Sequence, residues 1–326
     1  MTTKLLCPED YISDATQLAK QATNRISLLS FIVADHPATH DLINSLIDAS
    51  KRGVDVSVQA DIYTYGEVNG SLLPIRYFNK ASRAATTMAR RLRSAGVNFH
   101  WLGHGRVTLF NGRTHSKWLV IDNTVYSFGG VNIYQEGVEN TDYMLKLTDE
   151  TLANTLVTEQ KRIFAAEKNY HNYPSHQKKF KFGTVMFDGG FTGGSIIYRR
   201  VCELAEQAES IVFVSQYCPT GRLARILKKK KAAVYYNRPE QASFINRLLI
   251  WASIGLSQLP TLYSRDKYQH SKYIIMRFSD HTRVAITGSH NFAYAGVVSG
   301  TREIALETTD DQIIDQLEKF SNDYIY

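Results

Sequence analysis

The hydrophobic positions along the chain repeat one order of patterns twice. In the first half, a stretch with helical periodicity near residues 11–23 precedes an apolar run at residues 26–34. In the second half, a helical stretch near residues 195–208 precedes an apolar run at residues 210–217. Runs this rich in large apolar residues are typical of strands that are buried on both faces. The repeated order predicts two similar structural units.

Further pairs of elements follow each apolar run in the same order. Each run is followed by a second amphipathic helix, and Leu42, Ile43, Leu46 and Ile47 lie on one face of the first of these. The later matching pairs are strands at 54–61 and 232–236, helices near 82–94 and 241–253, and short strands at 97–102 and 259–263. A helix over residues 149–168 is expected to close the first half.

The predicted fold class is α/β, with two similar repeats that are each a mixed sheet flanked by helices. We expect an N-terminal repeat over residues 1–170, a linker over residues 171–185 and a C-terminal repeat over residues 186–326. The linker is expected because this segment is polar and aromatic and contains Pro174. Neither half alone holds a complete set of catalytic groups, so we place the active site at the interface between the repeats.

The composition indicates which binding partners and which cellular location we should expect for this protein. The 326 residues are 44% hydrophobic and carry a formal net charge of +7, which favours an anionic partner such as a membrane surface or a nucleic acid. Lysines cluster at residues 178–181 and 228–231. The three cysteines have no local spacing, which argues against a disulfide framework or a zinc site. No signal peptide and no run of about 18 apolar residues occurs, so we expect a cytoplasmic protein that associates peripherally with membranes.

Candidate chemistry appears twice, at matching places in the two halves. Each copy has a His-x-Lys pair, followed by a Gly-[Gly/Ser]-x-Asn segment and then by a carboxylate. The first copy contains His115, Lys117, Asp122, Gly130, Asn132 and Asp142, and the second contains His270, Lys272, Ser289, Asn291 and Glu303. A single His-x-Lys carries no information, but two copies at equivalent positions of a repeat indicate a shared site.

The residue types suit reactions at a phosphodiester. In an extended segment residues i and i+2 share a face, so each histidine points the same way as its lysine. Histidine can act as a nucleophile or as a proton donor near neutral pH, and two lysines can offset charge that develops on phosphate oxygens. Asn132 and Asn291 can hydrogen-bond the phosphate, while Asp142 and Glu303 could orient the imidazoles. We expect Gly130 and Ser289 to let the backbone approach a ligand closely. We expect alternation to point His290 away from the site.

These motifs resemble the phospholipase D superfamily, whose hallmark is His-x-Lys-(x)4-Asp-(x)6-Gly-[Gly/Ser]-x-Asn. The first copy matches it fully, with Asp122 at the aspartate position. In the second copy Arg277 stands at that position, and four extra residues separate Lys272 from Gly288. Asp280, in the longer loop, is a candidate replacement for the missing aspartate. The segment LFNGRTHSKWLVID looks most similar to the cardiolipin synthase and phosphatidyltransferase branch.

The resemblance implies a ping-pong mechanism without a metal or other cofactor. A phosphohistidine forms on one histidine while the other acts as acid and base, and by analogy we expect His115 to be the nucleophile and His270 the acid/base. The expected partners are a phospholipid substrate and an anionic membrane surface. A metal-independent nuclease remains the alternative, and a binding module without catalysis is a third. We expect residues 244–262 to form a core helix and strand rather than a membrane contact, while His104 and Arg106 could contact a headgroup.

Overall fold

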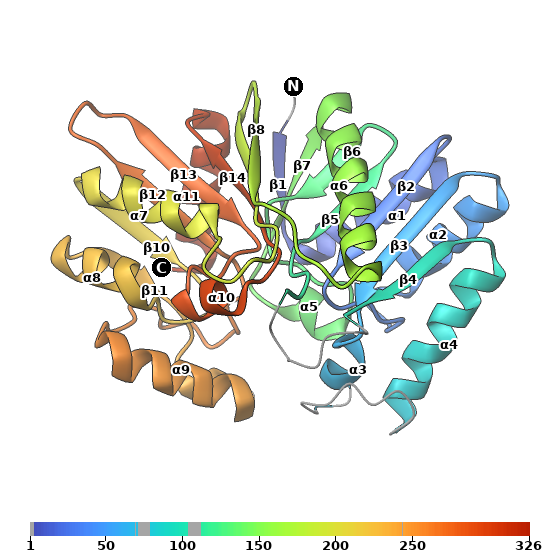
Figure 1. Cartoon of the computed structure of the whole chain (residues 1–326), viewed down its shortest axis with the longest axis horizontal. Coiled ribbons are helices and arrows are strands. Elements are labelled where there is room, and N and C mark those ends of the chain that lie inside the picture. The colour runs from blue at the N-terminus through green and yellow to red at the C-terminus, as the bar shows by residue number, and fades with distance from the viewer. Residues whose placement is uncertain (1–2, 69, 71–78, 104–111, 243) are drawn as a thin grey trace.

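Two seven-stranded sheets, one from each half of the chain, form the frame of the molecule (Figure 1). The computed structural model describes all residues except 1–2, 69, 71–78, 104–111 and 243. The strand orders are β1-β7-β6-β5-β2-β3-β4 and β11-β10-β12-β13-β14-β9-β8. In both sheets parallel and antiparallel pairs are mixed: β2 is parallel to β3 and antiparallel to β5, and β10 is parallel to β11 and antiparallel to β12. The α/β fold with two similar units is therefore confirmed.

The elements of the two halves follow a similar order along the chain, although β4 and β8 have no counterpart in the other half. The first half comprises β1 (Thr3–Leu6), α1 (Pro8–Gln21), β2 (Arg25–Ser30), α2 (His40–Lys51), β3 (Asp55–Asp61), α3 (Thr64–Glu67), α4 (Lys80–Ser94), β4 (Asn98–Leu102), β5 (Trp118–Ile121), β6 (Thr124–Ser127), α5 (Gln135–Glu139), β7 (Met144–Thr148) and α6 (Glu150–Lys168). The second half comprises β8 (His176–Phe180), β9 (Gly183–Phe187), α7 (Ile196–Gln207), β10 (Ser210–Val214), α8 (Gly221–Lys229), β11 (Ala233–Tyr235), the 3-10 helix η1 (Pro239–Gln241), α9 (Phe244–Ser257), β12 (Tyr273–Arg277), β13 (Arg283–Gly288), α10 (Tyr294–Ser299), β14 (Ile304–Thr308) and α11 (Asp311–Tyr324).

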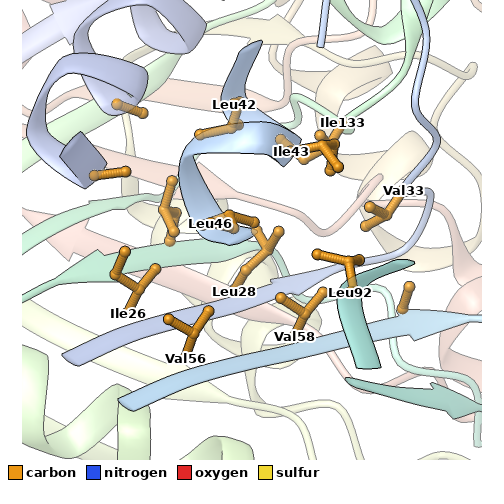
Figure 2. Close-up of a cluster of buried hydrophobic side chains, with 14 of the residues drawn as sticks. Ile26, Leu28, Val33, Leu42, Ile43, Leu46, Val56, Val58, Leu92 and Ile133 are labelled. Carbon is orange, nitrogen blue, oxygen red and sulfur yellow. The ribbon is translucent and has the colours of Figure 1, made fainter. Parts of the chain in front are cut away.

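The core of the first half follows from the predicted patterns. Figure 2 shows Leu42, Ile43 and Leu46 of α2 packed over the apolar face of β2 and β3. Burial of each such side chain contributes about 1.5–3 kcal/mol, so this face fixes the helix on the sheet. A second core cluster contains residues from both halves, including Trp118 of β5 and Ile275 of β12. The two halves therefore share part of their hydrophobic core.

The expected linker at residues 171–185 was partly wrong. Its second part forms β8 and the start of β9, which pair with each other and extend the second sheet beyond β14. The side chains of Gln177, Lys178 and Lys179 on β8 are exposed, so the strand has no apolar alternation that the sequence could reveal. Lysines on an edge strand are a common protection against pairing with another sheet.

Two expectations about residues 241–263 were also wrong. Residues 259–263, which all belong to the described part of the chain, form no strand, and Pro260 there has no backbone N–H to donate to a sheet. The helix is present as α9, but it is not a core helix. Ile250 is fully buried, whereas Leu248, Trp251 and Leu256 are 55%, 61% and 81% exposed. Most of the large apolar side chains described on this helix therefore face solvent.

Candidate active site

The two His-x-Lys segments lie in extended chain directly before the central strands β5 and β12. Each segment pairs with a segment of the opposite half through an isolated parallel bridge, Thr114 with Arg302 and Thr141 with Gln269. The backbone N–H of His115 donates to Arg302 O over 2.8 Å, and that of His270 donates to Thr141 O over 2.9 Å. Each half therefore donates an equivalent backbone hydrogen bond from its histidine to the other half.

These bridges place each histidine beside a carboxylate from the other half. His115 Nδ1 lies 3.0 Å from Glu303 Oε2, and His270 Nδ1 lies 2.7 Å from Asp142 Oδ2. An ionised carboxylate can only accept, so each Nδ1 donates its proton and Nε2 is the remaining ring nitrogen. The orienting role expected of Asp142 and Glu303 requires this geometry.

Electrostatics in the two pairs keep the carboxyl groups charged. Burial by itself would raise the pKa of Glu303, but the neighbouring His115 lowers it to about 2. The pKa of Asp142 is also lowered, against the effect of burial, by its hydrogen bond to His270. Burial lowers the pKa of both imidazoles. We therefore assign ionised carboxylates and neutral histidines to these two pairs.

The two lysines are buried behind the histidines. Lys117 is 1% exposed and Lys272 is fully buried. Lys117 Nζ donates to His115 O over 2.9 Å, and Lys272 Nζ donates to His270 O. Burial lowers the pKa of Lys117 to about 8 and that of Lys272 to about 7. Both are therefore held in a low-dielectric site where a positive charge interacts strongly with an anion.

The two asparagines line the same cavity as the histidines. Asn132 is 5% exposed, and its Oδ1 accepts from Ile32 N–H over 3.3 Å. Asn291 Oδ1 is buried without a hydrogen-bond partner among the described residues. An amide oxygen that accepts from the protein leaves the amide N–H₂ to donate to a ligand.

Gly130 and Ser289, which we expected to let the backbone approach a ligand, contact the carboxylates and lie outside the cavity lining. Gly130 N–H donates to Asp142 Oδ1 over 3.2 Å, and a Cβ on Gly130 would lie 2.5 Å from Asp142 Oδ2. Ser289 Oγ donates to Glu303 Oε2 over 2.5 Å. The small residues are needed here because the carboxylate itself approaches the backbone closely.

Asp122 lies at the far end of β5 from His115, in the β5–β6 turn. Its carboxylate accepts from the backbone N–H groups of Asn24 and Arg25 over 2.9 and 3.0 Å, which ties this turn to the start of β2. Asp280 lies in the exposed β12–β13 turn and accepts from Thr282. Neither aspartate is brought to the histidine pairs.

A cavity of about 680 Å³ opens onto these groups. The lining residues that the motifs predicted are His115, Asn132, His270, Asn291 and Glu303. Residues that sequence reasoning missed add aromatic and charged walls: Phe31, Tyr63, Glu67, Arg113, Tyr134, Tyr217 and Tyr268. Of these residues, only Arg113 could have been found from the sequence. It lies two residues before His115 in an extended segment, so the two side chains share a face.

His290 corrects another expectation, because it lines the cavity instead of pointing away from it. It is 2% exposed, and its Nδ1 accepts from Phe292 N–H over 2.8 Å. β13 ends at Gly288, so strand alternation no longer applies at this position. His104 and Arg106, the other candidate headgroup contacts, lie outside the described residues.

Comparisons with known proteins agree with the fold. The family model described as "Cardiolipin synthase, PLD-like domain" matches residues 16–164. Phosphatidylserine synthase from Haemophilus influenzae Rd KW20 is similar over 98% of this chain and 85% of that chain, with a TM-score of 0.72 and 16% identity. Polyphosphate kinase from Porphyromonas gingivalis is similar over 98% of this chain and 49% of that chain, with a TM-score of 0.62 and 11% identity. No curated protein matches the chain by sequence.

The described residues form neither a metal-binding cluster nor a membrane-spanning helix. Within the described ranges, no group of three or more His, Cys, Asp or Glu side chains is placed to hold a metal ion. Each helix of those ranges falls short of the length or the apolar character that crossing a bilayer requires.

Proposed function

This chain belongs to the phospholipase D superfamily, and we propose that it is a phosphatidyltransferase or phospholipase D, similar to cardiolipin synthases, that acts on a phospholipid phosphodiester. The observation that carries the proposal is the pair of crossed contacts, His115 with Glu303 and His270 with Asp142. Each imidazole is held in one tautomer at a common cavity, as a nucleophile and a proton donor require.

In the proposed first step, His115 Nε2 attacks phosphorus and the bond from phosphorus to the leaving alkoxide breaks. His270 protonates that alkoxide from Nε2, so it carries a second proton when the step begins. The anionic phosphodiester and the Asp142 carboxylate both favour this protonated form. The products of the step are a phosphatidyl-His115 intermediate and a free alcohol.

In the second step, His270 Nε2 takes a proton from an incoming alcohol or water. The oxygen attacks phosphorus, the bond from phosphorus to His115 Nε2 breaks, and a new phosphatidyl ester or phosphatidic acid is released. The ammonium groups of Lys117 and Lys272 offset the charge on the non-bridging oxygens in both steps. The amides of Asn132 and Asn291, which line the same cavity, would donate to these oxygens.

Helix α9 supports a lipid substrate and a peripheral contact with the membrane. Leu249 and Ser253 line the cavity, whereas Trp251 and Leu256 of the same helix are exposed. The helix has no acidic residue, and Arg247 near its start is exposed. An apolar surface with a tryptophan and a basic residue suits the interface of an anionic bilayer. A lipid could then enter the cavity from that surface.

A nuclease is the second candidate, because the net charge of +7 also suits a polyanionic nucleic acid. One assay separates the two. The purified protein is incubated with phosphatidylglycerol vesicles, with and without added glycerol, and with single-stranded DNA in parallel, and products are read by mass spectrometry. We expect lipid products and intact DNA. DNA cleavage without lipid turnover would transfer the proposal to the nuclease.

A further inference from the structure

Glu67, at the end of α3, lines the cavity that holds both catalytic pairs. The Tyr134 hydroxyl donates to Glu67 Oε1 over 3.0 Å. Among the residues that the structure describes, no lysine, arginine or histidine forms an ion pair with this carboxylate. Burial raises the pKa of Glu67 above its ordinary value. A partly desolvated carboxylate without a cation is costly unless a ligand supplies one.

Tyrosine side chains gather around this carboxylate. Tyr63, Tyr134, Tyr217 and Tyr268 all line the cavity. Burial raises the pKa of each of the four hydroxyls, and the negative charge on Glu67 raises each pKa further. Glu67 and the four rings therefore line one cavity, and Tyr134 bonds the carboxylate directly.

Two side chains, Gln216 and Phe31, contact these rings, and Phe31 also connects them to the catalytic centre. Gln216 Nε2 donates to the hydroxyls of Tyr217 and Tyr268, both over 3.1 Å. The Phe31 ring stacks on Tyr63 with centroids 5.2 Å apart, and the same ring meets the His115 imidazole edge-on at 5.2 Å. One aromatic ring thus separates the tyrosine cluster from the proposed nucleophile.

We propose that Glu67 and its surrounding tyrosines form a subsite for the ammonium group of a lipid headgroup, such as ethanolamine or choline. This inference rests on the proposed function and names its donor lipid. Aromatic faces attract alkylammonium cations, and a carboxylate supplies the opposite charge. The phosphate of such a headgroup would lie at Lys117 and Lys272, so a headgroup with both charges matches the two charged ends of the site.

Binding and turnover are measured separately, so that the subsite and the proposed function can fail independently. Choline chloride is titrated by calorimetry into the wild type and into Glu67→Gln, with sodium chloride as the matched salt. The glutamine keeps the shape and an oxygen that accepts from Tyr134, and it removes only the charge. Glu139→Gln is the control, since Glu139 is exposed on α5 and lies outside the cavity lining. Tyr63→Phe and Tyr63→Leu test the aromatic face.

We expect choline to bind the wild type, Glu139→Gln and Tyr63→Phe, and to bind Glu67→Gln and Tyr63→Leu at least 10-fold more weakly, a loss of about 1.4 kcal/mol or more. In vesicle assays, Glu67→Gln should lower kcat/KM for phosphatidylethanolamine at least 10-fold more than it lowers kcat/KM for phosphatidylglycerol. Choline binding without any lipid turnover would support the subsite and remove the proposed function. Lipid turnover with no choline binding, or with both lipids affected equally by Glu67→Gln, would overturn the subsite.

Discussion

His270 of the second half donates from Nδ1 to the carboxylate of Asp142 in the first half over 2.7 Å. The reciprocal contact joins His115 to Glu303 over 3.0 Å. Each of these two imidazoles is therefore held by the half that does not carry it. The site is complete only when the two halves are docked, which makes the shared core between the sheets a condition for activity.

We expect Asp142→Asn and Glu303→Gln to lower kcat by about 10²- to 10⁴-fold, the order of loss seen when an orienting carboxylate is removed. KM should change little, because neither carboxylate is proposed to contact substrate. Steady-state kinetics on vesicles across pH 5–9 would show this, and the profile should shift for these variants. Asp280→Asn, in an exposed turn, is the control. A rise in KM together with the fall in kcat, and a loss of thermal stability, would indicate a structural role instead.

We expect His115→Ala and His270→Ala each to abolish turnover while circular dichroism stays unchanged. If His115 is the nucleophile, only the variant that retains it can form the covalent intermediate. With phosphatidyl-p-nitrophenol, whose leaving group needs no protonation, His270→Ala quenched in alkaline denaturant should therefore carry a phosphatidyl adduct on His115 by peptide mass spectrometry, and His115→Ala should carry none. His281→Asn is a suitable control, because His281 is exposed with φ of 66°, which asparagine tolerates. An adduct on His270 would exchange the two roles.

The lysines predict opposite pH trends for activity and stability. The pKa values of Lys117 and Lys272 are about 8 and about 7, below the ordinary value of 10.5. Raising the pH through 7–8 removes their charge in the folded free enzyme, so kcat/KM should fall. Between pH 7 and 10.5 the unfolded chain holds more protons on these lysines than the folded chain. Stability should therefore rise with pH there, by at most about 1.4 kcal/mol per pH unit for each lysine.

Urea unfolding at several pH values checks the second trend. Lys272→Met should flatten the rise in unfolding free energy and should lower kcat by about 10²- to 10³-fold, as expected for loss of one preorganised charge. Lys179→Met is the control, because Lys179 is exposed on β8. A pH-independent stability in the wild type would contradict the lowered pKa values.

The sequence predicted the repeat, most element positions and the two motifs, because these depend on local periodicity and spacing. It could not predict which carboxylate orients which histidine. Asp142 and His270 are 128 residues apart, and their contact depends on how the two halves dock. The position of His290 was mispredicted because β13 ends two residues earlier. The exposure of Trp251 was mispredicted because an apolar sequence alone does not distinguish a core helix from a helix that meets a membrane.

The two lysine clusters and α9 do not share one face of the molecule. Figure 1 shows β8, which carries Lys178 and Lys179, at the opposite end of the molecule from α9. α8 ends at Lys229 and packs near α9. We therefore expect α9 and the end of α8 to meet the bilayer, and the β8 lysines to play no part.

Truncation of the exposed apolar side chains tests this orientation. Trp251→Ala with Leu256→Ala should weaken binding to phosphatidylglycerol vesicles about 100-fold, because about 3 kcal/mol of apolar transfer free energy is lost. Lys178→Gln with Lys179→Gln should bind like the wild type.

Wild-type binding should also weaken as salt rises, since each basic residue near an anionic surface contributes about 1 kcal/mol that salt screens. Co-sedimentation at low and high salt, with single-stranded DNA as competitor, measures all three. Tight DNA binding without vesicle binding would favour the nuclease, and equal binding by both double variants would remove α9 as the membrane contact.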